Sequence, residues 1–140
     1  MFKPHDAGAA GGEEPAESPF KGKTGVVRIW HALFNSIAGL EDAWRHESAF
    51  RQELLLATFL VPLACVAPVS NVERALLIGS VMLVMIVELL NTGVEVAIDR
   101  ISFDHHKLSK RAKDIGSAAV FVALLLLAMV WSLILGPHLF

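Results

Sequence analysis

The feature that most constrains this chain is a run of 22 residues without a charge, at positions 115–136. A transmembrane helix needs about 20 consecutive apolar residues, so this run predicts a membrane-spanning helix. The composition agrees, because 54% of the 140 residues are hydrophobic and only 19% are charged. An average soluble domain has about 45–50% apolar and about 25% charged residues, so a membrane protein of one domain is indicated.

Two further apolar segments predict two more spans, over about residues 49–69 and about residues 75–101. The first is the weaker, because Arg51 and Glu53 lie near its start and Pro62 lies inside it. Its apolar core is shorter than the ~20 residues that a span needs. Three helices with short connections predict an all-α membrane protein that folds as a helical bundle.

The N-terminal part of the chain has a different character. Residues 1–25 are rich in glycine, alanine, proline, glutamate and lysine without apolar periodicity, so we expect a flexible cytoplasmic tail. Residues 26–46 place apolar side chains at spacings of three and four, the pattern of an amphipathic helix. Trp30 and Trp44 favour the boundary between membrane and water, which predicts a helix on the membrane surface rather than on a soluble core. Residues 26–140 are the expected membrane domain.

The charge distribution predicts how the chain crosses the membrane. Residues 105–113 carry four lysine and arginine side chains, whereas the connection near residues 68–74 carries one. By the positive-inside rule, the lysine-rich connection and the N-terminus are cytoplasmic. The formal net charge of −2 does not suggest nucleic acid as a partner. The start does not resemble a cleavable signal peptide, and the single cysteine, Cys65, excludes a disulfide within the chain.

Four polar side chains follow one another along the second predicted span: Glu88, Asn91, Glu95 and Asp99. At about 100° per residue, all four lie on one face of a helix. Each ionised carboxylate at membrane depth costs about 2.5–3.5 kcal/mol, so such residues need partners and often have a function. This polar stripe suits a general base on a lipid hydroxyl, with Mg²⁺ on the carboxylates nearer the cytosol. A proton relay, or a stripe that joins helices, explains the spacing equally well.

Other polar residues near the membrane boundary leave alternatives open. Arg28, Arg111 and Lys113 supply cations for phosphate groups. Glu47 is a possible metal ligand from a second helix, but by position alone a solvated charge at a helix junction is the better interpretation. The adjacent His105 and His106 favour a solvated connection over a transition-metal site, because neighbouring residues point in different directions.

Longer motifs become recognisable when they are taken together. They are Glu-Ser-Ala-Phe-Arg-Gln-Glu at residues 47–53, Val-Glu-Leu-Leu-Asn-Thr-Gly-Val-Glu at residues 87–95, Asp-Arg-Ile at residues 99–101 and Arg-Ala-Lys-Asp-Ile-Gly-Ser-Ala-Ala-Val at residues 111–120. In this order they resemble the prokaryotic diacylglycerol kinase family over roughly residues 26–138. The resemblance implies a lipid kinase of the inner membrane that uses ATP with Mg²⁺. It also implies a homotrimer with shared active sites, each subunit having three transmembrane helices and one surface helix.

The resemblance further implies roles for individual residues. Glu88 is the expected general base on the lipid hydroxyl. The expected metal ligands are Glu47 and Glu95, and the expected supporting residues are Asn91 and Asp99. The expected ATP-binding residues are Arg28, Asn35, Glu47, Glu95, Asp104, His105, His106, Lys113 and Asp114. The expected lipid-binding residues are Ser36, Ala49, Phe50, Arg51, Gln52, Glu53, Glu88 and Ser117.

The sequence departs from the family in places and favours one lipid. Asn35 and His105 stand where close relatives carry tyrosine, and this chain has no tyrosine. Relatives in Gram-positive bacteria, which phosphorylate undecaprenol, usually have Ala-Lys-Asp-x-Ala-Ala-Gly, whereas residues 112–118 are Ala-Lys-Asp-Ile-Gly-Ser-Ala. This difference favours diacylglycerol as the substrate, with undecaprenol as the alternative. A proton- or ion-conducting bundle is the alternative of a different class.

Overall fold

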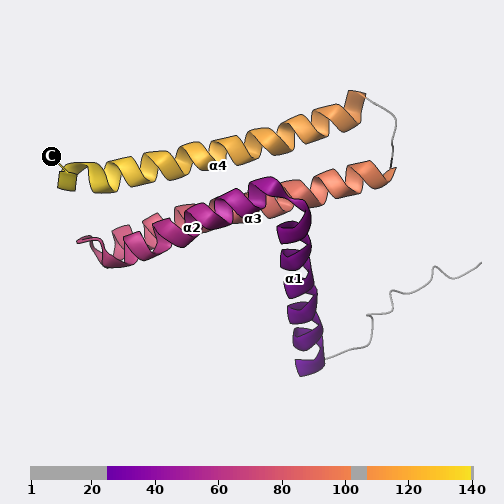
Figure 1. The fold of residues 1–140 in the computed structure, drawn as a ribbon, viewed down its shortest axis with the longest axis horizontal. Coiled ribbons are helices and arrows are strands. Elements are labelled where there is room, and N and C mark those ends of the chain that lie inside the picture. Colours follow the sequence, from indigo (N-terminus) through magenta and orange to yellow (C-terminus); the bar gives the residue numbers. More distant parts are fainter. Residues whose placement is uncertain (1–24, 102–106, 140) are drawn as a thin grey trace, which may run out of the picture. The chain divides into compact units, whose positions relative to one another are not determined.

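The computed structural model describes residues 25–101 and 107–139, and within them the chain forms helices and no strand. The helices follow in order along the chain as α1 (Val26–His46), α2 (Ser48–Val66), α3 (Asn71–Ile101) and α4 (Lys107–Leu139) (Figure 1). The prediction of an all-α protein is confirmed. Residues 1–24, on which the predicted tail falls, lie outside the described residues, as do Asp104, His105 and His106.

The chain divides into two compact units, Met1–Ser36 and Ile37–Phe140, whose boundary falls within α1. In the first unit, Gly25 has a φ of 74°, a left-handed conformation that side chains disfavour. Its carbonyl oxygen accepts a hydrogen bond from the backbone amide of Arg28 at 3.1 Å, so the helix begins directly after the glycine. The large apolar side chains that follow are exposed, which is consistent with a surface helix. Its place on a membrane stays a prediction.

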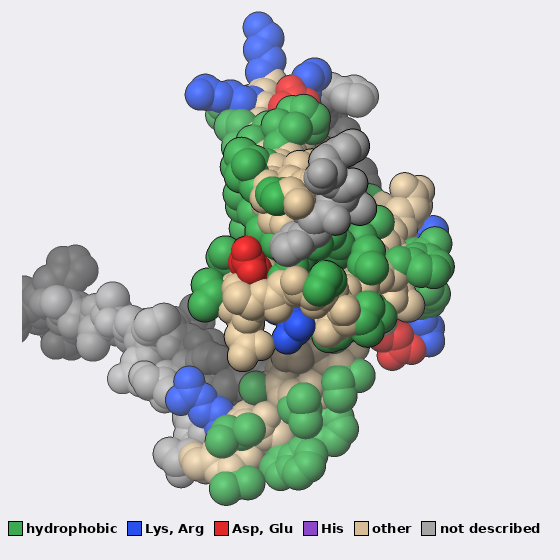
Figure 2. All heavy atoms as spheres, turned by 90° about the vertical axis from the view of Figure 1, so that its left-hand side faces the viewer, with side chains coloured by type: hydrophobic (Ala, Val, Ile, Leu, Met, Phe, Trp, Pro, Cys, Tyr) green, Lys and Arg blue, Asp and Glu red, His purple; other side chains and the backbone are tan. Residues whose placement is uncertain are grey.

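Three of the described helices are long and apolar enough to cross a membrane: Ser48–Val66, Asn71–Arg100 and Lys107–Pro137. Apolar side chains cover much of the face shown in Figure 2, and the charged ones gather in a few places. So large an apolar surface is unfavourable in water, whereas lipid tails are as apolar as leucine. The prediction of three membrane-spanning helices is confirmed.

The helices and the predicted spans differ at their ends. α4 begins at Lys107 rather than at residue 115, so the charged residues 107–113 are helical and do not form a loop. Lys110 and Asp114 form an exposed ion pair at 2.6 Å across one turn, which favours the helix there. An apolar run marks only the part of a helix that meets lipid, and this helix continues beyond it. α2 ends at Val66, shortly before Pro68.

The junction between α1 and α2 is the single residue Glu47, in an extended conformation. The Arg51 guanidinium donates from Nη1 to the carbonyl oxygens of Trp44 at 2.9 Å and Arg45 at 3.3 Å. The last carbonyl groups of a helix have no partners within it, so Arg51 caps the C-terminal end of α1. This cap fixes the point at which the chain turns from α1 into α2.

The turn between α2 and α3 is held by a capping box and by an arginine. The Ser70 backbone amide donates to Glu73 Oε2 at 2.8 Å, and the Glu73 amide donates to Ser70 Oγ at 3.3 Å. Arg74 donates from Nε to the carbonyl oxygen of Ala64 and from Nη2 to that of Ala67, each at 3.2 Å. One guanidinium therefore joins the end of α2 to the start of α3.

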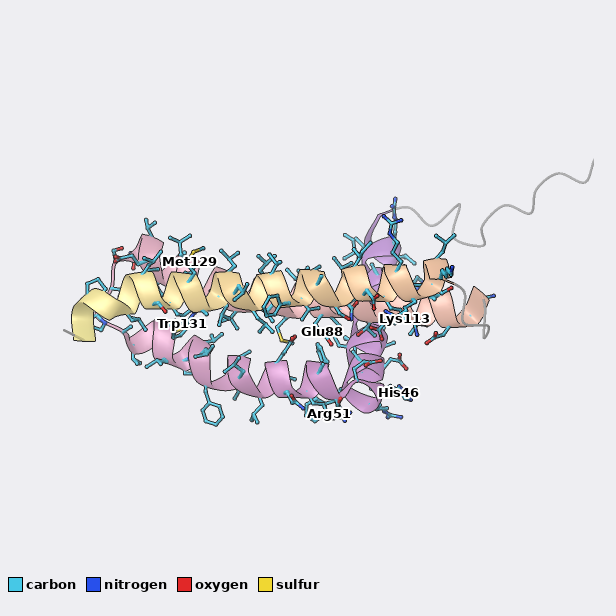
Figure 3. All side chains as sticks on the ribbon, turned by 90° about the horizontal axis from the view of Figure 1, so that it is seen from above. His46, Arg51, Glu88, Lys113, Met129 and Trp131 are labelled. Carbon is cyan, nitrogen blue, oxygen red and sulfur yellow. The ribbon has the colours of Figure 1, made fainter. Side chains whose placement is uncertain are left out.

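The core is centred on α3, which contacts both α2 and α4. A cluster of buried side chains joins α1, α2 and α3: Ala43, Phe50, Ala57, Val81 and Met85. Leu77 is fully buried, and its carbonyl oxygen accepts a hydrogen bond from Trp131 Nε1 of α4 at 3.3 Å (Trp131 is labelled in Figure 3). This packing fixes the register of α3, and with it the level of the polar side chains further along the helix.

Candidate active site

The polar stripe lies on one continuous helix, α3, and its burial decreases along that helix. Glu88 is only 4% exposed, Asn91 and Glu95 are half-buried, and Asp99 is exposed. Glu88 is the only buried ionisable side chain in the part of the chain that the structure describes. Spacings of three and four residues keep the four side chains on one side of α3. The stripe therefore leads from the protein interior to an exposed helix end.

Glu88 points toward α2 (Figure 3). The carboxylates of Glu47, Glu53 and Glu95 are all near enough to repel its negative charge. Glu53 Oε2 is buried and has no hydrogen-bond partner within residues 25–101 and 107–139. Four acidic side chains, from the junction of α1 and α2, from α2 and from α3, thus lie near one another. Buried charges need a compensating partner, so this region suits a cation or a proton from a ligand.

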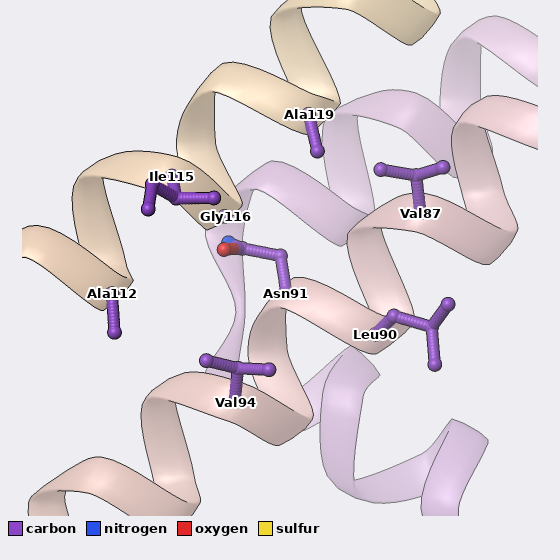
Figure 4. A pocket seen from close by; sticks show the side chains of 8 residues that line it. All are labelled: Val87, Leu90, Asn91, Val94, Ala112, Ile115, Gly116 and Ala119. Atoms are coloured by element: carbon purple, nitrogen blue, oxygen red, sulfur yellow. The ribbon is translucent and has the colours of Figure 1, made fainter.

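Asn91 and Glu95 are joined by a hydrogen bond, in which Asn91 Nδ2 donates to Glu95 Oε1 at 3.1 Å. Because only the amide nitrogen can donate to a carboxylate, Oδ1 is the atom that points toward Gly116 of α4 (Figure 4). Asn91 also lines a groove of about 470 Å³ between α3 and α4, in which its amide is the main polar group. The orientation of Glu95 is therefore linked to the packing of α3 on α4.

The predicted residues on α4 occupy different surroundings. Lys113 Nζ lies 2.6 Å from Asp99 Oδ1, which joins α4 to the exposed end of the stripe. Asp114 instead pairs with Lys110 of its own helix. Ser117 is exposed. The structure thus brings Lys113 to the stripe, whereas no hydrogen bond or ion pair joins Asp114 or Ser117 to it among the described residues.

The predicted lipid-binding residues at the start of α2 also differ in their burial and contacts. Phe50 is buried in the core cluster, and Arg51 is engaged in the cap of α1. Ala49 and Gln52 are exposed, whereas Glu53 is half-buried beside Glu88. Phe50 also lines an apolar pocket of about 370 Å³ formed by the second half of α1 together with α2 and α3. Such a pocket is large enough for part of a lipid chain.

Three predicted residues belong to the first unit: Arg28, Asn35 and Ser36, which are all exposed on α1. The Ser36 hydroxyl donates to the carbonyl oxygen of Ala32 at 2.9 Å, one turn back. Arg28 and Asn35 are seven residues apart and therefore lie on the same side of the helix. The roles of these residues, like those of residues 104–106, stay predictions.

The carboxylates can be tested against the metal that the resemblance implies. No three histidine, cysteine, aspartate or glutamate side chains of the described chain gather into a metal-binding group. The carboxylates of Glu47 and Glu95 nevertheless both lie near enough to repel the charge of Glu88. Mg²⁺ prefers oxygen ligands and commonly binds one or two carboxylates together with substrate phosphates. The donor set therefore fits Mg²⁺ that arrives with a nucleotide better than it fits a closed structural metal site.

Three contacts were not predicted from the sequence. These are the bridge from Arg74 to the end of α2, the hydrogen bond from Trp131 to α3 and the approach of Asn91 to Gly116. The sequence only weakly indicated these contacts. Arg74 lies at a helix start, Trp131 lies inside an apolar run, and Gly116 lies in a spanning helix. Small residues often mark close contacts between membrane helices.

Comparison with known proteins identifies related chains. The sequence profile described as prokaryotic diacylglycerol kinase matches residues 34–135. The diacylglycerol kinase of Pseudomonas aeruginosa is 52% identical over 118 residues, which cover 84% of this chain and 96% of that protein. That of Escherichia coli strain K12 is 48% identical over 115 residues, covering 82% of this chain and 94% of the relative. That of Haemophilus influenzae is 46% identical over 112 residues, covering 80% and 95%.

These matches bear directly on the predictions from sequence. The profile match includes the whole of α2 and α3 and most of α4, and with them the polar stripe. The relatives are matched along almost their full length. The expected family, and with it an enzyme of the phosphotransferase class, is confirmed. The chain belongs to the prokaryotic diacylglycerol kinase family.

Proposed function

We propose that this chain transfers the γ-phosphate of ATP to the free hydroxyl of diacylglycerol, giving phosphatidic acid and ADP. The observation that carries the proposal is Glu88, a buried carboxylate in a membrane-spanning helix with three other acidic side chains near it. A lipid hydroxyl lies at the membrane boundary, where a base on such a helix can meet it. The name of the relatives, diacylglycerol kinase, supports the choice of lipid.

In this proposal Glu88 is the general base. Its carboxylate takes the proton of the lipid hydroxyl while that oxygen forms a bond to the γ-phosphorus. The bond from the same phosphorus to the oxygen that bridges to the β-phosphate breaks, and ADP leaves with the electron pair. Burial of Glu88 keeps water away from the reacting oxygen, which limits transfer of the phosphate to water.

The other carboxylates and Lys113 serve the nucleotide. Glu47 and Glu95 are the proposed ligands of Mg²⁺, which when bound offsets the charge on the phosphates. Asn91 orients the Glu95 carboxylate through its hydrogen bond. Lys113 exchanges its pairing with Asp99 for a phosphate oxygen. The remaining proposed nucleotide contacts are Arg28, Asn35, Asp104, His105, His106 and Asp114, and the proposed lipid contacts are Ser36, Ala49, Phe50, Arg51, Gln52, Glu53 and Ser117.

We further propose a homotrimer in the inner membrane with a cytoplasmic N-terminus. The lysine-rich start of α4 supports this orientation by the positive-inside rule. Sites shared between subunits agree with the finding that no hydrogen bond or ion pair joins Asp114 or Ser117 to the stripe in the described part of one chain. Mixing Glu88→Gln subunits with Asp114→Ala subunits tests the sharing. Recovery of activity in the mixture supports it, and no recovery argues for sites within single chains.

The function is tested by purifying the protein in lipid and measuring transfer of labelled γ-phosphate from ATP, with Mg²⁺ present or chelated. Diacylglycerol and undecaprenol are offered in parallel. We expect Mg²⁺-dependent labelling of diacylglycerol. Labelling mainly of undecaprenol keeps the mechanism and overturns the substrate. If a folded sample labels neither lipid, the proposal fails, and ion flux through proteoliposomes becomes the next measurement.

A further inference from the structure

Within the polar stripe, the Asn91 side chain of α3 lies directly against Gly116 of α4 (Figure 4). A Cβ atom placed on Gly116 would overlap Asn91 Oδ1 and would lie 3.2 Å from Asn91 Cγ. The space beside the Gly116 backbone is therefore filled by the amide of Asn91. Any larger residue at position 116 has to displace that amide.

This space differs from that at the other glycines of the described helices. A Cβ atom placed on Gly39, Gly79, Gly93 or Gly136 would meet no atom within 4 Å. At those positions an alanine fits without displacing a neighbour. The need for glycine at position 116 thus comes from one particular side chain, Asn91, and not from a general shortage of space along α3 or α4.

The amide of Asn91 has two ends with different surroundings. Nδ2 donates to Glu95 Oε1 at 3.1 Å. Oδ1 is buried, and among the described residues it has no hydrogen-bond partner. No hydrogen bond to α4 therefore holds this end in place, and the lack of a side chain on Gly116 is what gives it room. The direction in which Nδ2 donates depends on that room.

We propose that Gly116 is a positioning residue for the nucleotide site. By leaving room for the Asn91 amide, it keeps Nδ2 directed at Glu95 and so fixes the carboxylate that is the proposed Mg²⁺ ligand. Gly116 touches neither substrate nor metal and acts through Asn91 and Glu95. The inference rests on the proposed function, in which Glu95 is a ligand of Mg²⁺.

The first test compares Gly116→Ala with Gly136→Ala, the same change on the same helix where a Cβ meets nothing. Partners that orient metal-binding carboxylates typically change affinity or activity about 10–100-fold when lost. We expect Gly116→Ala to weaken binding of a non-hydrolysable Mg²⁺–ATP analogue about tenfold by calorimetry, and to raise the KM for Mg²⁺–ATP with little change in the KM for lipid. Gly136→Ala should match the unmodified protein. Unchanged nucleotide binding in folded Gly116→Ala overturns the proposal.

The second test separates positioning from helix packing. Asn91→Ala should weaken nucleotide binding as Gly116→Ala does, and the double variant should be no weaker than Asn91→Ala alone. If the two losses multiply, Gly116 acts independently of Asn91 and the proposal is wrong. If Gly116→Ala alone does not fold, the proposal requires that it folds when Asn91→Ala is also present, and a double variant that stays unfolded overturns it.

The unmodified protein distinguishes failure of this inference from failure of the proposed function. If it transfers no phosphate to either lipid and binds no Mg²⁺–ATP analogue, the proposed function fails, and with it the task given to Glu95. If it is active and the Gly116→Ala protein binds the analogue equally well, only the role of Gly116 is lost.

Discussion

The two halves of α3 differ in how their buried groups are satisfied. From residue 75 to residue 87 the buried side chains are mostly apolar. Leu77 is fully buried, and Val81 belongs to the core cluster, against which side chains of α2 and α4 pack. From residue 88 to residue 99 the polar stripe runs along the helix, although Leu89 still packs against the core, and the neighbours that act on the charge of Glu88 are acidic. The first half of α3 thus packs in the apolar core, and its second half carries the polar stripe.

The difference separates groups whose contacts are complete within one chain from groups that are left without a hydrogen-bond partner. In the apolar half, the Leu77 carbonyl receives a hydrogen bond from Trp131, and that contact is complete within one chain. In the polar half, Asn91 Oδ1 is buried without a hydrogen-bond partner in the described chain, and so is Glu53 Oε2 of the neighbouring α2. Buried polar groups are normally satisfied, so unsatisfied ones are expected where a metal, nucleotide or lipid completes the set. The apolar half holds the polar half in place.

The largest effect is expected from Glu88→Gln. This change keeps the size of the side chain and removes its ability to accept a proton, so turnover should fall by about 10²–10⁴-fold, the contribution of a general base. Helix content and assembly should not change. Glu41→Gln, the same chemical change at an exposed ion pair with Arg45, serves as the control. Phosphate transfer by Glu88→Gln within threefold of the unmodified rate would rule out Glu88 as the base.

A smaller effect, on stability instead of chemistry, is expected from Leu77→Ala. Truncation leaves a cavity at a site that is 0% exposed, and Leu→Ala changes in cores cost about 2–5 kcal/mol in soluble proteins. We expect about 2 kcal/mol in the free energy of unfolding, measured by denaturing detergent in mixed micelles. The neighbouring Leu76 is 54% exposed, so Leu76→Ala is the matched control. Equal losses in the two variants would show that the apolar half is not packed as described.

The smallest effect is expected at the contact between Lys113 and Asp99. Both side chains reach solvent, and exposed ion pairs contribute little to stability. Lys113→Met should therefore leave the unfolding transition unchanged. It should raise the KM for Mg²⁺–ATP, because in the proposed function the lysine binds a phosphate oxygen. Lys110→Met, which breaks the exposed pair with Asp114, is the comparison. A marked loss of stability in Lys113→Met alone would place this contact among the groups that fold the chain.

Much of the fold could be predicted because its main signals are local. Apolar run length gave three spans, and spacings of three and four gave the helix over residues 26–46. The start of α4 at Lys107 was not predicted. An apolar run ends where the helix leaves the lipid, whereas the hydrogen bonding of the helix continues beyond that point. The bridges made by Arg74 were beyond prediction, since they depend on how α2 ends relative to α3.

The site could be predicted only in part. Periodicity places Glu88, Asn91, Glu95 and Asp99 on one helix face, but it does not say which of them is buried. Glu47 shows why position in the sequence is not sufficient. Its position alone predicts a solvated charge at a helix junction, whereas in the folded chain its carboxylate lies near enough to repel the charge of Glu88. That proximity arises from the turn between α1 and α2, which a linear pattern does not contain. The functional roles of these residues remain predictions.

The lengths of the spanning helices set a mechanical constraint on the site. α2 has 19 residues, or about 28 Å at 1.5 Å per residue, whereas α3 has 31 residues and is about 46 Å long. A hydrocarbon layer of about 30 Å is therefore barely matched by α2 and exceeded by α3. A thicker bilayer has to be accommodated around α2, by local thinning, by flanking side chains that reach to the interface or by association of helices, because α2 has no length to spare. Because Glu53 lies near the start of this short helix, we expect its depth, and that of the nearby Glu88, to respond to the thickness of the surrounding lipid.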